Sequence, residues 1–335
     1  MTVMLIGEAW GKDEEEQGKP FVGSAGKMLK ALMGHAGISY NECYVTNVFN
    51  LRPKPTNDIK NLCGKKVEGV PGWPAIQQGK YIRHEYLPEL QRLIAEVDHV
   101  RPSLIIGVGA TPAWALLKTR GIRGIRGSPH YYLSPKHGRI KFFPTYHPSA
   151  VLREYSLRGI VLADLEKARR EMEYPEIRRP RREIWLEPTL DDLRIFEEKY
   201  ILPSPDLSVD IETAGDQITM IGFAPTIDRA LNLPFYDAER GNYWRTLEEE
   251  LQAWYWVKRI LEMKKRITGQ NFLYDIKFLW GKMGMPPIHF EHDTMLLHHA
   301  LQPEMEKGLG FLGSIYTDEQ AWKFMRHNET VKKED

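Results

Sequence analysis

Residues 7–21 read GEAWGKDEEEQGKPF, and residues 147–153 read HPSAVLR. In the first stretch, the apolar run TVMLI breaks at Gly7 into a loop that is crowded with carboxylates and closed by an aromatic residue. In the second, a histidine followed by proline and serine closes the apolar run IKFFPTY in the same way. Because carboxylate, aromatic and imidazole groups then lie on loops at strand ends, the two stretches predict a pocket that grips a flat polar ring.

The composition is that of an ordinary globular protein. The chain has 335 residues, which favours two domains, with 42% hydrophobic and 27% charged residues. No apolar run approaches the ~20 residues of a membrane span, and the N-terminus lacks the pattern of a secretory signal. Cys43 and Cys63 cannot form a disulfide framework or a four-thiolate metal site by themselves. We therefore expect a cytoplasmic protein of a reducing, intracellular compartment.

The net charge of +1 conceals an uneven distribution. Residues 1–175 contain 25 Lys and Arg against 17 Asp and Glu, a net charge of +8, and the remaining residues contain 21 against 28, a net charge of −7. A basic half indicates a polyanionic partner such as nucleic acid. The alternative is a chance difference in charge between two solvated surfaces.

Short apolar runs alternate with helical patterns in the first half. This alternation predicts a three-layer α/β/α sandwich with a mostly parallel sheet. Ligands bind such folds at the carboxyl ends of strands, where both opening motifs and Asn47 fall. The expected strands are VMLIG, CYVTNVF, SLIIGVG and IKFFPTYH, and the expected helices are residues 24–36, residues 84–98, TPAWALL and residues 157–173.

The second half begins again as an α/β pattern after a connector. The stretch YPEIRRPRRE is typical of a solvated linker, with a phosphate-binding strap as the alternative. We predict one domain at residues 1–174, a linker at 175–183 and a second domain at 184–335. The expected strands of the second domain are LSVDIET, ITMIGFA, RALNLPF and RITGQ, and its expected helices are residues 246–264, NFLYDIKFLWGKM and HDTMLLHHAL.

Each polar or aromatic residue of the opening motifs has a structural and a functional interpretation. The carboxylates of residues 8–16 could form a solvated loop, but the glycines among them would let the backbone approach a ligand closely. Phe21 could be a core residue or a stacking platform. Asn47 could cap a turn or present a paired donor and acceptor to a nucleobase edge. His147 is open to both interpretations in the same way.

Together, GEAWGKDEEEQGKPFVGSAGKML, YVTNVFNLRP and FPTYHPSAVLR resemble the uracil-DNA glycosylase superfamily, in particular its family 4, over roughly residues 3–170. The resemblance implies that Phe21 stacks on a flipped base and that Asn47 reads its Watson–Crick edge. It implies that His147 stabilises negative charge on the departing base, while Glu8 and Glu14 orient water or stabilise the cationic sugar. Stabilising both charges that develop would favour cleavage of the glycosidic bond.

The resemblance also implies contacts with the DNA backbone. Ser149 and Arg153 would hold phosphate, and Val151 with Leu152 could form a wedge that enters the base stack. A separate basic segment, KTRGIRGIRG at residues 118–127, offers further cations among glycines. We expect phosphate contacts from this segment, with a plain surface loop as the alternative. Its arginines are Arg120, Arg123 and Arg126.

The chain departs from the family 4 pattern in two respects. Trp10 stands where family 4 usually has proline. Family 4 members hold an iron–sulfur cluster through four cysteines, two of them ahead of the first strand, whereas this chain has only Cys43 and Cys63. We therefore expect no iron–sulfur cluster. Residues 57–80 match no part of the family, and the target could be uracil or another base.

Carboxylates of the second half form another candidate site. Asp210 and Glu212 flank Ile211 on an expected strand, where residues i and i+2 point to one side. Asp275 lies on an expected helix with Asn271 one turn earlier on the same face. Three converging carboxylates would bind hard divalent cations, and two such ions can support cleavage of a phosphodiester. We therefore predict a Mg²⁺ or Mn²⁺ site at Asp210, Glu212 and Asp275.

The second half resembles the 3′–5′ proofreading exonuclease domain of family A DNA polymerases over about residues 183–330. The motifs that carry the resemblance are DIET, GQNFLYDIKFLWGKMG and HDTMLLHHAL. It implies a ribonuclease H-like, DnaQ-like domain with a mixed sheet, in which Asn271 shapes the DNA site. The third motif, a tyrosine with an aspartate four residues later, is missing because Tyr316 has Gln320 at that offset.

Two motif sets in order favour a bifunctional DNA-processing enzyme. We expect a glycosylase-like base reader joined to an exonuclease, as the N-terminal part of a phage-type family A DNA polymerase. Its partners would be single-stranded or primer–template DNA and a downstream or separate polymerase. The alternative is a binding module that recognises uracil or a modified base, followed by an inactive exonuclease remnant. A structural docking platform would predict instead that Glu8, Asn47 and His147 do not line one pocket.

Overall fold

The computed structural model describes residues 2–179 and 181–319, which form two compact units. The second unit is Arg179–Leu309, and the first unit consists of the described residues before Arg179 together with residues 310–319. The first boundary falls inside the linker predicted at 175–183. The second boundary differs from the prediction, which gave all residues of 184–335 to one domain. The difference arises because residues 310–319 hydrogen-bond to side chains of the first unit.

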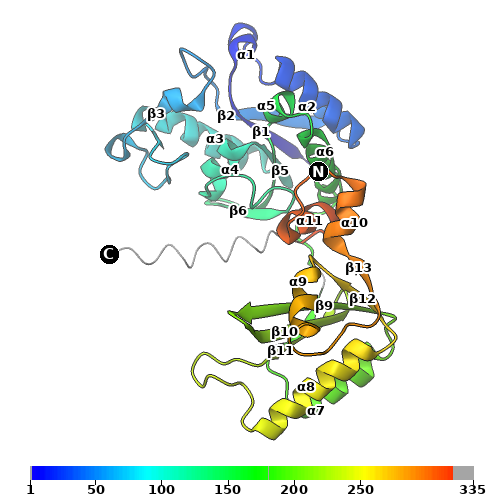
Figure 1. The fold of residues 1–335 in the computed structure, drawn as a ribbon. Helices are drawn as coiled ribbons and strands as arrows, with labels where there is room; N and C mark the ends of the chain where they lie inside the picture. Colours follow the sequence, from blue (N-terminus) through cyan, green and yellow to red (C-terminus); the bar gives the residue numbers. More distant parts are fainter. Residues whose placement is uncertain (1, 180, 320–335) are drawn as a thin grey trace. The chain divides into compact units, whose positions relative to one another are not determined.

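A five-stranded, mostly parallel sheet forms the centre of the first unit (Figure 1). The strand order is β2-β1-β5-β7-β6, and only the pairing of β6 with β7 is antiparallel. The sequence did not predict β6, because this edge strand has no buried apolar run. The strands are β1 (Val3–Ala9), β2 (Cys43–Phe49), β5 (Leu104–Val108), β6 (His130–Ser134) and β7 (Gly138–Thr145).

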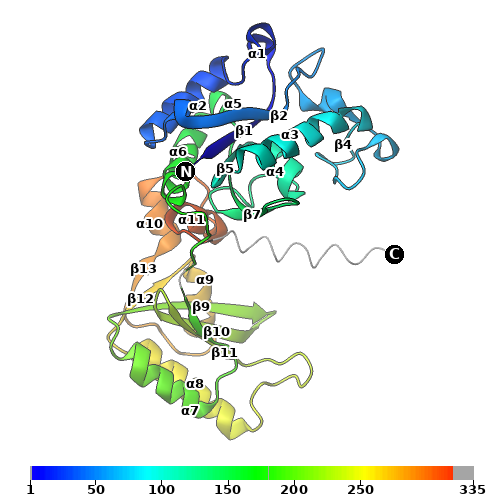
Figure 2. The same ribbon diagram turned by 180° about the vertical axis from the view of Figure 1, so that it is seen from behind.

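Helices cover both faces of this sheet, as the sequence predicted (Figures 1 and 2). Alternate residues of a strand point to opposite faces, so β1 contributes to two cores. Met4 and Ile6 pack in the core under α3 (Leu87–Val100) and α4 (Ala110–Leu117). Val3 and Leu5 pack in the core on the other face. The helices of that face are α2 (Ser24–His35), α5 (Pro148–Arg153) and α6 (Leu157–Glu171).

Short elements fill the loops of the first unit. The acidic stretch that the sequence suggested as a loop forms the helix α1 (Lys12–Gln17), which ends at Gly18 in a left-handed conformation with φ of 63°. The unmatched region 57–80 contains the small strand β3 (Cys63–Gly64), which pairs with β4 (Tyr81–Ile82). Single 3₁₀ turns occur at Tyr40–Glu42, Ile59–Leu62, Lys66–Glu68 and His84–Tyr86. The helix α11 (Leu309–Tyr316) begins at the last residue of the second unit, and its other residues belong to the first.

The second unit contains a six-stranded mixed sheet with the order β13-β12-β9-β10-β11-β8. The strand β10 is antiparallel to both of its neighbours, β9 and β11, and the remaining pairs are parallel. The strand β9 therefore lies inside the sheet and carries Asp210. The strands are β8 (Glu183–Trp185), β9 (Asp206–Ala214), β10 (Gln217–Thr226), β11 (Arg229–Pro234), β12 (Arg266–Gly269) and β13 (Phe290–Asp293).

Helices bury one face of β9 and leave the other exposed. Leu207, Val209 and Ile211 share a core with residues of α7 (Leu190–Phe196) and α8 (Leu247–Glu262). A π-helical turn at Glu197–Ile201 continues α7. The other helices of the unit are α9 (Leu273–Leu279) and α10 (Thr294–Leu301). No helix in the described part of the chain is long and apolar enough to cross a membrane.

Candidate active site

A cavity of about 880 Å³ opens at the carboxyl ends of β1 and β2, beside the start of α5. It is the place where the fold of a parallel sheet favours ligand binding. Every residue predicted from the opening motifs to act on a base lines this one cavity: Glu8, Glu14, Phe21, Asn47 and His147. The docking-platform hypothesis required Glu8, Asn47 and His147 to lie apart, so it is wrong on this point.

Gly7 allows Asn47 and Phe21 to approach each other at the floor of the cavity. Gly7 pairs with Asn47 in the register of β1 and β2. A Cβ atom at Gly7 would stand 2.2 Å from Asn47 Oδ1 and 2.5 Å from Phe21 Cζ. No side chain fits there, because carbon atoms do not approach so closely without a shift of the neighbouring groups. The glycine that ends the first apolar run thus shapes the pocket.

Phe21 packs in the core and also lines the cavity, while its role as a stacking platform stays a prediction. The residue is 5% exposed and packs in the core that includes Leu29 and Val151. Its backbone has φ of 56°, a left-handed conformation that is uncommon for an aromatic residue. A Cβ atom at Gly26 would lie 2.0 Å from the Phe21 carbonyl oxygen, so the start of α2 packs directly on this backbone.

His147 presents a neutral imidazole to the cavity. The Ser149 backbone N–H donates to His147 Nδ1 at 3.2 Å, and the Ser149 hydroxyl lies 2.7 Å from the same atom. Since Nδ1 accepts, the ring proton lies on Nε2. Burial lowers the pKa of His147 to about 4, and the charge of Arg153 acts in the same direction. The ring is stacked against Phe21 with centroids 6.4 Å apart.

The surroundings of Glu8 in the cavity shift the pKa of its carboxyl group. Burial raises the pKa of Glu8 above its ordinary value, and the nearby charge of Asp58 contributes in the same sense. The Thr111 hydroxyl donates a hydrogen bond to Glu8 Oε2 and counteracts this shift. Thr111 lies in the first turn of α4 and was not predicted as a site residue. Its signal was its place just after a buried parallel strand, where such folds bind ligands.

Glu14 organises the loop that surrounds the cavity. Its Oε1 accepts hydrogen bonds from the Val22 and Gly23 backbone N–H groups at 3.0 and 2.9 Å. Its Oε2 accepts from Gly11 N at 3.1 Å. These bonds tie the start of α1 to the segment that carries Phe21. The side chain thus has a structural role beside the catalytic role that the sequence suggested.

The residues predicted to contact DNA, as phosphate ligands or as a wedge, lie in different environments. Ser149, Arg153 and Leu152 line the cavity, whereas Val151 is fully buried and cannot act as a wedge. Arg120 and Arg123 are exposed on the segment after α4. The sequence also missed Trp10, Asn57, Asp58 and Gln77, which line the cavity; three of them belong to the unmatched region 57–80.

Arg126 is a correction to the predicted DNA interface. It is 1% exposed, and its guanidinium donates to Asp164 Oδ2 at 3.0 Å and Oδ1 at 2.5 Å. Asp164 is itself fully buried and also accepts from the Thr145 hydroxyl at 2.8 Å. A buried guanidinium that is already bidentate to a carboxylate cannot reach a phosphate. Sequence alone could not separate it from Arg123, because both follow the same Gly-Ile pattern.

The cysteines of this chain do not fit a four-thiolate cluster. Cys43 Sγ lies 3.4 Å from the Ser39 carbonyl oxygen, and Cys63 Sγ lies 3.5 Å from that of Ile59. Burial raises the pKa of the Cys43 thiol to about 11, which disfavours the thiolate that a metal ligand needs. We derive no chemical step through an iron–sulfur cluster.

The carboxylates of the second unit do not assemble the predicted metal centre. Asp210 and Glu212 lie on the exposed face of β9, whereas Asp275 is 3% exposed and accepts a hydrogen bond from Ile211 N at 2.9 Å. Among residues 2–179 and 181–319, no group of three or more His, Cys, Asp or Glu side chains is placed to hold a metal ion. This corrects the prediction of a ready Mg²⁺ or Mn²⁺ site.

Asn271 is a second correction in this unit. The helix α9 begins only at Leu273, and Asn271 precedes it in a left-handed conformation with φ of 54°. Its backbone N–H donates to Asp293 Oδ1 at 3.0 Å. Asn271 therefore does not share a helical face with Asp275, because it belongs to the turn that leads into the helix.

Asp275 carries a testable pH dependence of stability. Burial raises its pKa to about 7, with smaller contributions from the charges of Asp210 and Asp293. A carboxyl whose folded pKa is raised destabilises the fold as pH rises from about 4 to about 7. We expect Asp275→Asn to raise the melting temperature by several degrees at pH 8 and to leave it unchanged at pH 4.

Thermal melts of the two proteins across this pH range check the expectation. The exposed Asp216, which pairs with Lys282 Nζ, provides the matched control, and Asp216→Asn should give no gain at pH 8. The two melting temperatures should differ more as the pH rises. If this difference does not grow with pH, the raised pKa assigned to the buried Asp275 carboxyl is wrong.

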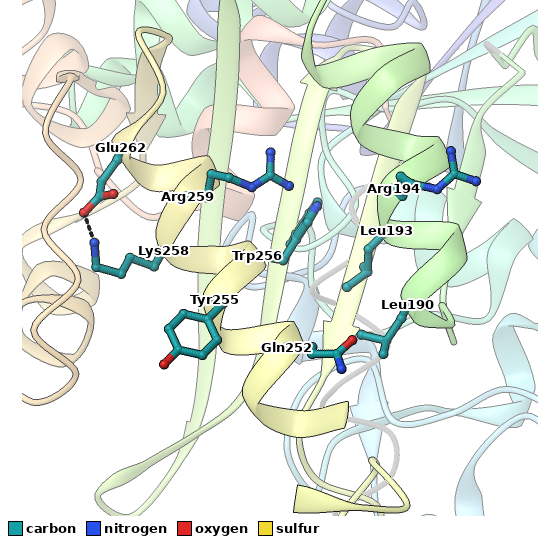
Figure 3. Close-up of a pocket in the computed structure, with 9 residues that line it drawn as sticks. All are labelled: Leu190, Leu193, Arg194, Gln252, Tyr255, Trp256, Lys258, Arg259 and Glu262. Carbon is teal, nitrogen blue, oxygen red and sulfur yellow. Dashed lines mark hydrogen bonds and ion pairs between the residues drawn. The ribbon is translucent and has the colours of Figure 1, made fainter. Parts of the chain in front are cut away.

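Two further cavities lie in the second unit. Figure 3 shows Trp256, Leu193 and Leu190 in a groove of about 560 Å³ between α8 and α7. The basic side chains of this groove form ion pairs with carboxylates, as Figure 3 shows for Lys258 and Glu262. The charges of the groove therefore do not indicate a binding site for an anion. An apolar cavity of about 330 Å³ lies on the exposed sheet face and includes Asp210, but Glu212 and Asp275 do not line it.

A parallel sheet with a carboxylate, an amide, an aromatic ring and an imidazole in one cavity at its strand ends defines an α/β protein built to bind a polar, planar ligand. The comparisons with known proteins agree with this class. Residues 1–172 match the family model of the uracil DNA glycosylase superfamily. The chain belongs to this superfamily, and the match ends before the second unit.

Several similar proteins carry the name type-4 uracil-DNA glycosylase. The one from Thermotoga maritima is 32% identical over 175 residues, which cover 50% of this chain and 76% of the relative. The one from Pyrobaculum aerophilum is 32% identical over 175 residues, covering 49% and 75%. The one from Saccharolobus solfataricus is 30% identical over 174 residues, covering 50% and 69%.

Proposed function

We propose that the first unit is a DNA glycosylase that removes uracil from DNA. The observation that carries this proposal is that Glu8, Phe21, Asn47 and His147 line one cavity. Similarity to type-4 uracil-DNA glycosylases supports the substrate. A target base inside a duplex has to leave the stack before any of these groups can reach it, and unstacking costs a few kcal/mol.

Each cavity residue has a role that its geometry permits. The ring of Phe21 provides a stacking surface, and the Asn47 amide offers a donor and an acceptor to the base edge. The neutral His147 has its proton on Nε2, so it donates a hydrogen bond to the base as negative charge develops there. Glu8, as a carboxylate, stabilises positive charge on the sugar or orients the attacking water. Ser149 and Arg153 are placed at the rim to contact a phosphate.

The direct test is an excision assay on the full chain. We expect alkali-labile sites at uracil in single-stranded or double-stranded oligonucleotides, and none in matched strands that carry thymine. An absence of alkali-labile sites in the uracil strands would contradict the proposal. A gel shift that favours uracil-containing DNA without any cleavage would establish the alternative, a non-catalytic binding module.

For the second unit, we infer a ribonuclease H-like fold, and we propose 3′–5′ exonuclease activity as a second candidate function. The motif resemblance supports it, and so does a mixed sheet in which β9 presents Asp210 and Glu212 on one exposed face. The three carboxylates as placed do not fit a two-metal centre, so we derive no cleavage step from them. The family A polymerase context belongs to the same proposal.

A labelled single strand tests this candidate. Shortened products that require Mg²⁺ or Mn²⁺, and that disappear in Asp210→Ala, would support a 3′–5′ exonuclease. Unchanged strand length would identify the second unit as an inactive remnant. The reading frame beyond Asp335 tests the polymerase context, because polymerase motifs there would support it and their absence would contradict it.

A further inference from the structure

The chain returns to the first unit after the second unit ends. Residues 310–319, here called the returning segment, lie outside residues 1–172 that match the glycosylase superfamily. Leu312 and Ser314 of this segment are 5% and 6% exposed, so the segment is packed rather than laid on the surface. Its role therefore cannot be read from the family.

Buried cations of the first unit hold the returning segment. Lys167 Nζ donates to the Ser314 carbonyl oxygen at 2.6 Å and to that of Thr317. Arg126 Nη1 donates to Ser314 Oγ at 2.9 Å. The Ser128 hydroxyl donates to the Glu319 carbonyl oxygen at 2.8 Å. Burial lowers the pKa of Lys167 to about 8, which reflects how far this ammonium is removed from water.

The same buried groups continue to the strand that carries His147. Arg126 pairs with Asp164, and Asp164 accepts a hydrogen bond from the Thr145 hydroxyl at 2.8 Å. Thr145 is the last residue of β7 and precedes His147 by two positions. Gly127 N also donates to the Pro144 carbonyl oxygen at 3.0 Å. A continuous chain of polar contacts thus leads from Ser314 through Arg126 and Asp164 to the His147 turn.

Two aromatic rings near the Arg126 guanidinium lie along this path. The guanidinium carbon lies 5.7 Å from the ring centroid of Phe311, in the returning segment, and 5.6 Å from that of Tyr146, the neighbour of His147. A buried guanidinium keeps one orientation only while its partners are in place, because a desolvated charge without partners is costly. Removing a partner at one end of such a network therefore alters the orientation of groups at the other end.

We propose that the returning segment is a positioning element of the cavity. Ser314 positions His147 through Arg126 and Asp164, and Thr145 connects Asp164 to the turn that carries His147. The proposal rests on the proposed glycosylase function. Docking of residues 310–319 fixes the guanidinium on Asp164, and Asp164 fixes the end of β7 from which His147 enters the cavity. Neither Ser314 nor Thr145 contacts the base.

The variants Ser314→Ala and Thr145→Val test the proposal in the full chain, because each removes one hydroxyl and keeps the fold's apolar contacts. We expect each to lower kcat for uracil release about fivefold with KM unchanged, as for loss of one hydrogen bond. The double variant should lose little more than either single one, because both act on one path. Arg170→Ala is the matched control. It removes an exposed ion pair with Asp318 of the same segment and should leave kcat unchanged.

A second measurement separates this proposal from the glycosylase proposal. The His147 ring signals in NMR spectra report its environment without any turnover, and they should shift in Ser314→Ala but not in Arg170→Ala. An inactive unsubstituted protein would contradict the glycosylase function alone. Wild-type kcat together with unshifted His147 signals in both hydroxyl variants would overturn the positioning role, even if their melting temperatures fall.

Discussion

Replacing His147 by alanine is expected to lower kcat/KM for uracil release by roughly 10²–10³-fold, the usual effect of removing one donor to a developing anion. The neutral ring donates from Nε2 because Ser149 N–H occupies Nδ1. Its pKa of about 4 keeps it neutral at physiological pH, so the loss should be the same from pH 6 to pH 8. Steady-state kinetics on a uracil-containing strand give this ratio.

His147 also caps the first turn of α5, so its loss has a structural component to be separated. Removal of such a cap costs about 1 kcal/mol, which thermal melts would detect. Replacement of the exposed His35 by alanine serves as a control for the loss of an imidazole elsewhere, because the His35 ring bonds to the Ala31 carbonyl oxygen of its own helix. If His147→Ala melts like the unsubstituted protein and still releases uracil at an unchanged rate, the assigned role of this ring is wrong.

Replacing Arg126 by alanine is expected to lower the free energy of unfolding by about 3–5 kcal/mol, the usual cost of breaking a buried ion pair. Asp164 would remain fully buried without its bidentate partner. Burial already raises the pKa of Asp164, and Arg126, Thr145 and Lys167 oppose this shift, with Arg126 contributing most. Chemical denaturation of the purified proteins measures the loss.

Arg123→Ala provides the matched control, because Arg123 is exposed on the same basic segment. It should leave stability unchanged and weaken binding to DNA, with a smaller dependence of affinity on salt concentration. The opposite pattern, a stable Arg126→Ala protein that loses DNA affinity, would restore Arg126 to the DNA interface from which its burial removes it.

The sequence predicted the first unit well because its signals are local or periodic. Buried parallel strands are typically continuous apolar runs: CYVTNVF has the bounds of β2, and VMLIG forms the first five residues of β1. The edge strand β6 was not predicted because it has no continuous buried apolar run: only Tyr132 and Ser134 of its five residues are buried. The acidic loop proved helical because Gly11 and Glu14 form a capping arrangement at its start.

The motifs predicted the main polar and aromatic residues of the cavity, but not the neighbouring residues that contact them. The motifs place polar side chains directly after apolar strands, and these side chains are Glu8, Asn47 and His147. Thr111 donates a hydrogen bond to Glu8 although the two residues are more than a hundred positions apart in the sequence. Residues of region 57–80, which the motifs did not predict, line part of the cavity. These contacts depend on how segments that are distant in the sequence pack together, and a local sequence pattern does not predict such packing.

The sequence by itself determined the superfamily, the buried strands β1, β2, β5 and β7, and the residue types that line the cavity, because these follow from short motifs and hydrophobic periodicity. Only the tertiary structure decided which charges are buried. It placed Arg126 on Asp164 instead of on DNA, buried Asp275 while Glu212 stays exposed, and returned residues 310–319 to the first unit. The physical reason is that the solvation and pairing of a charge depend on everything packed around it, and neighbours in space are not neighbours in sequence.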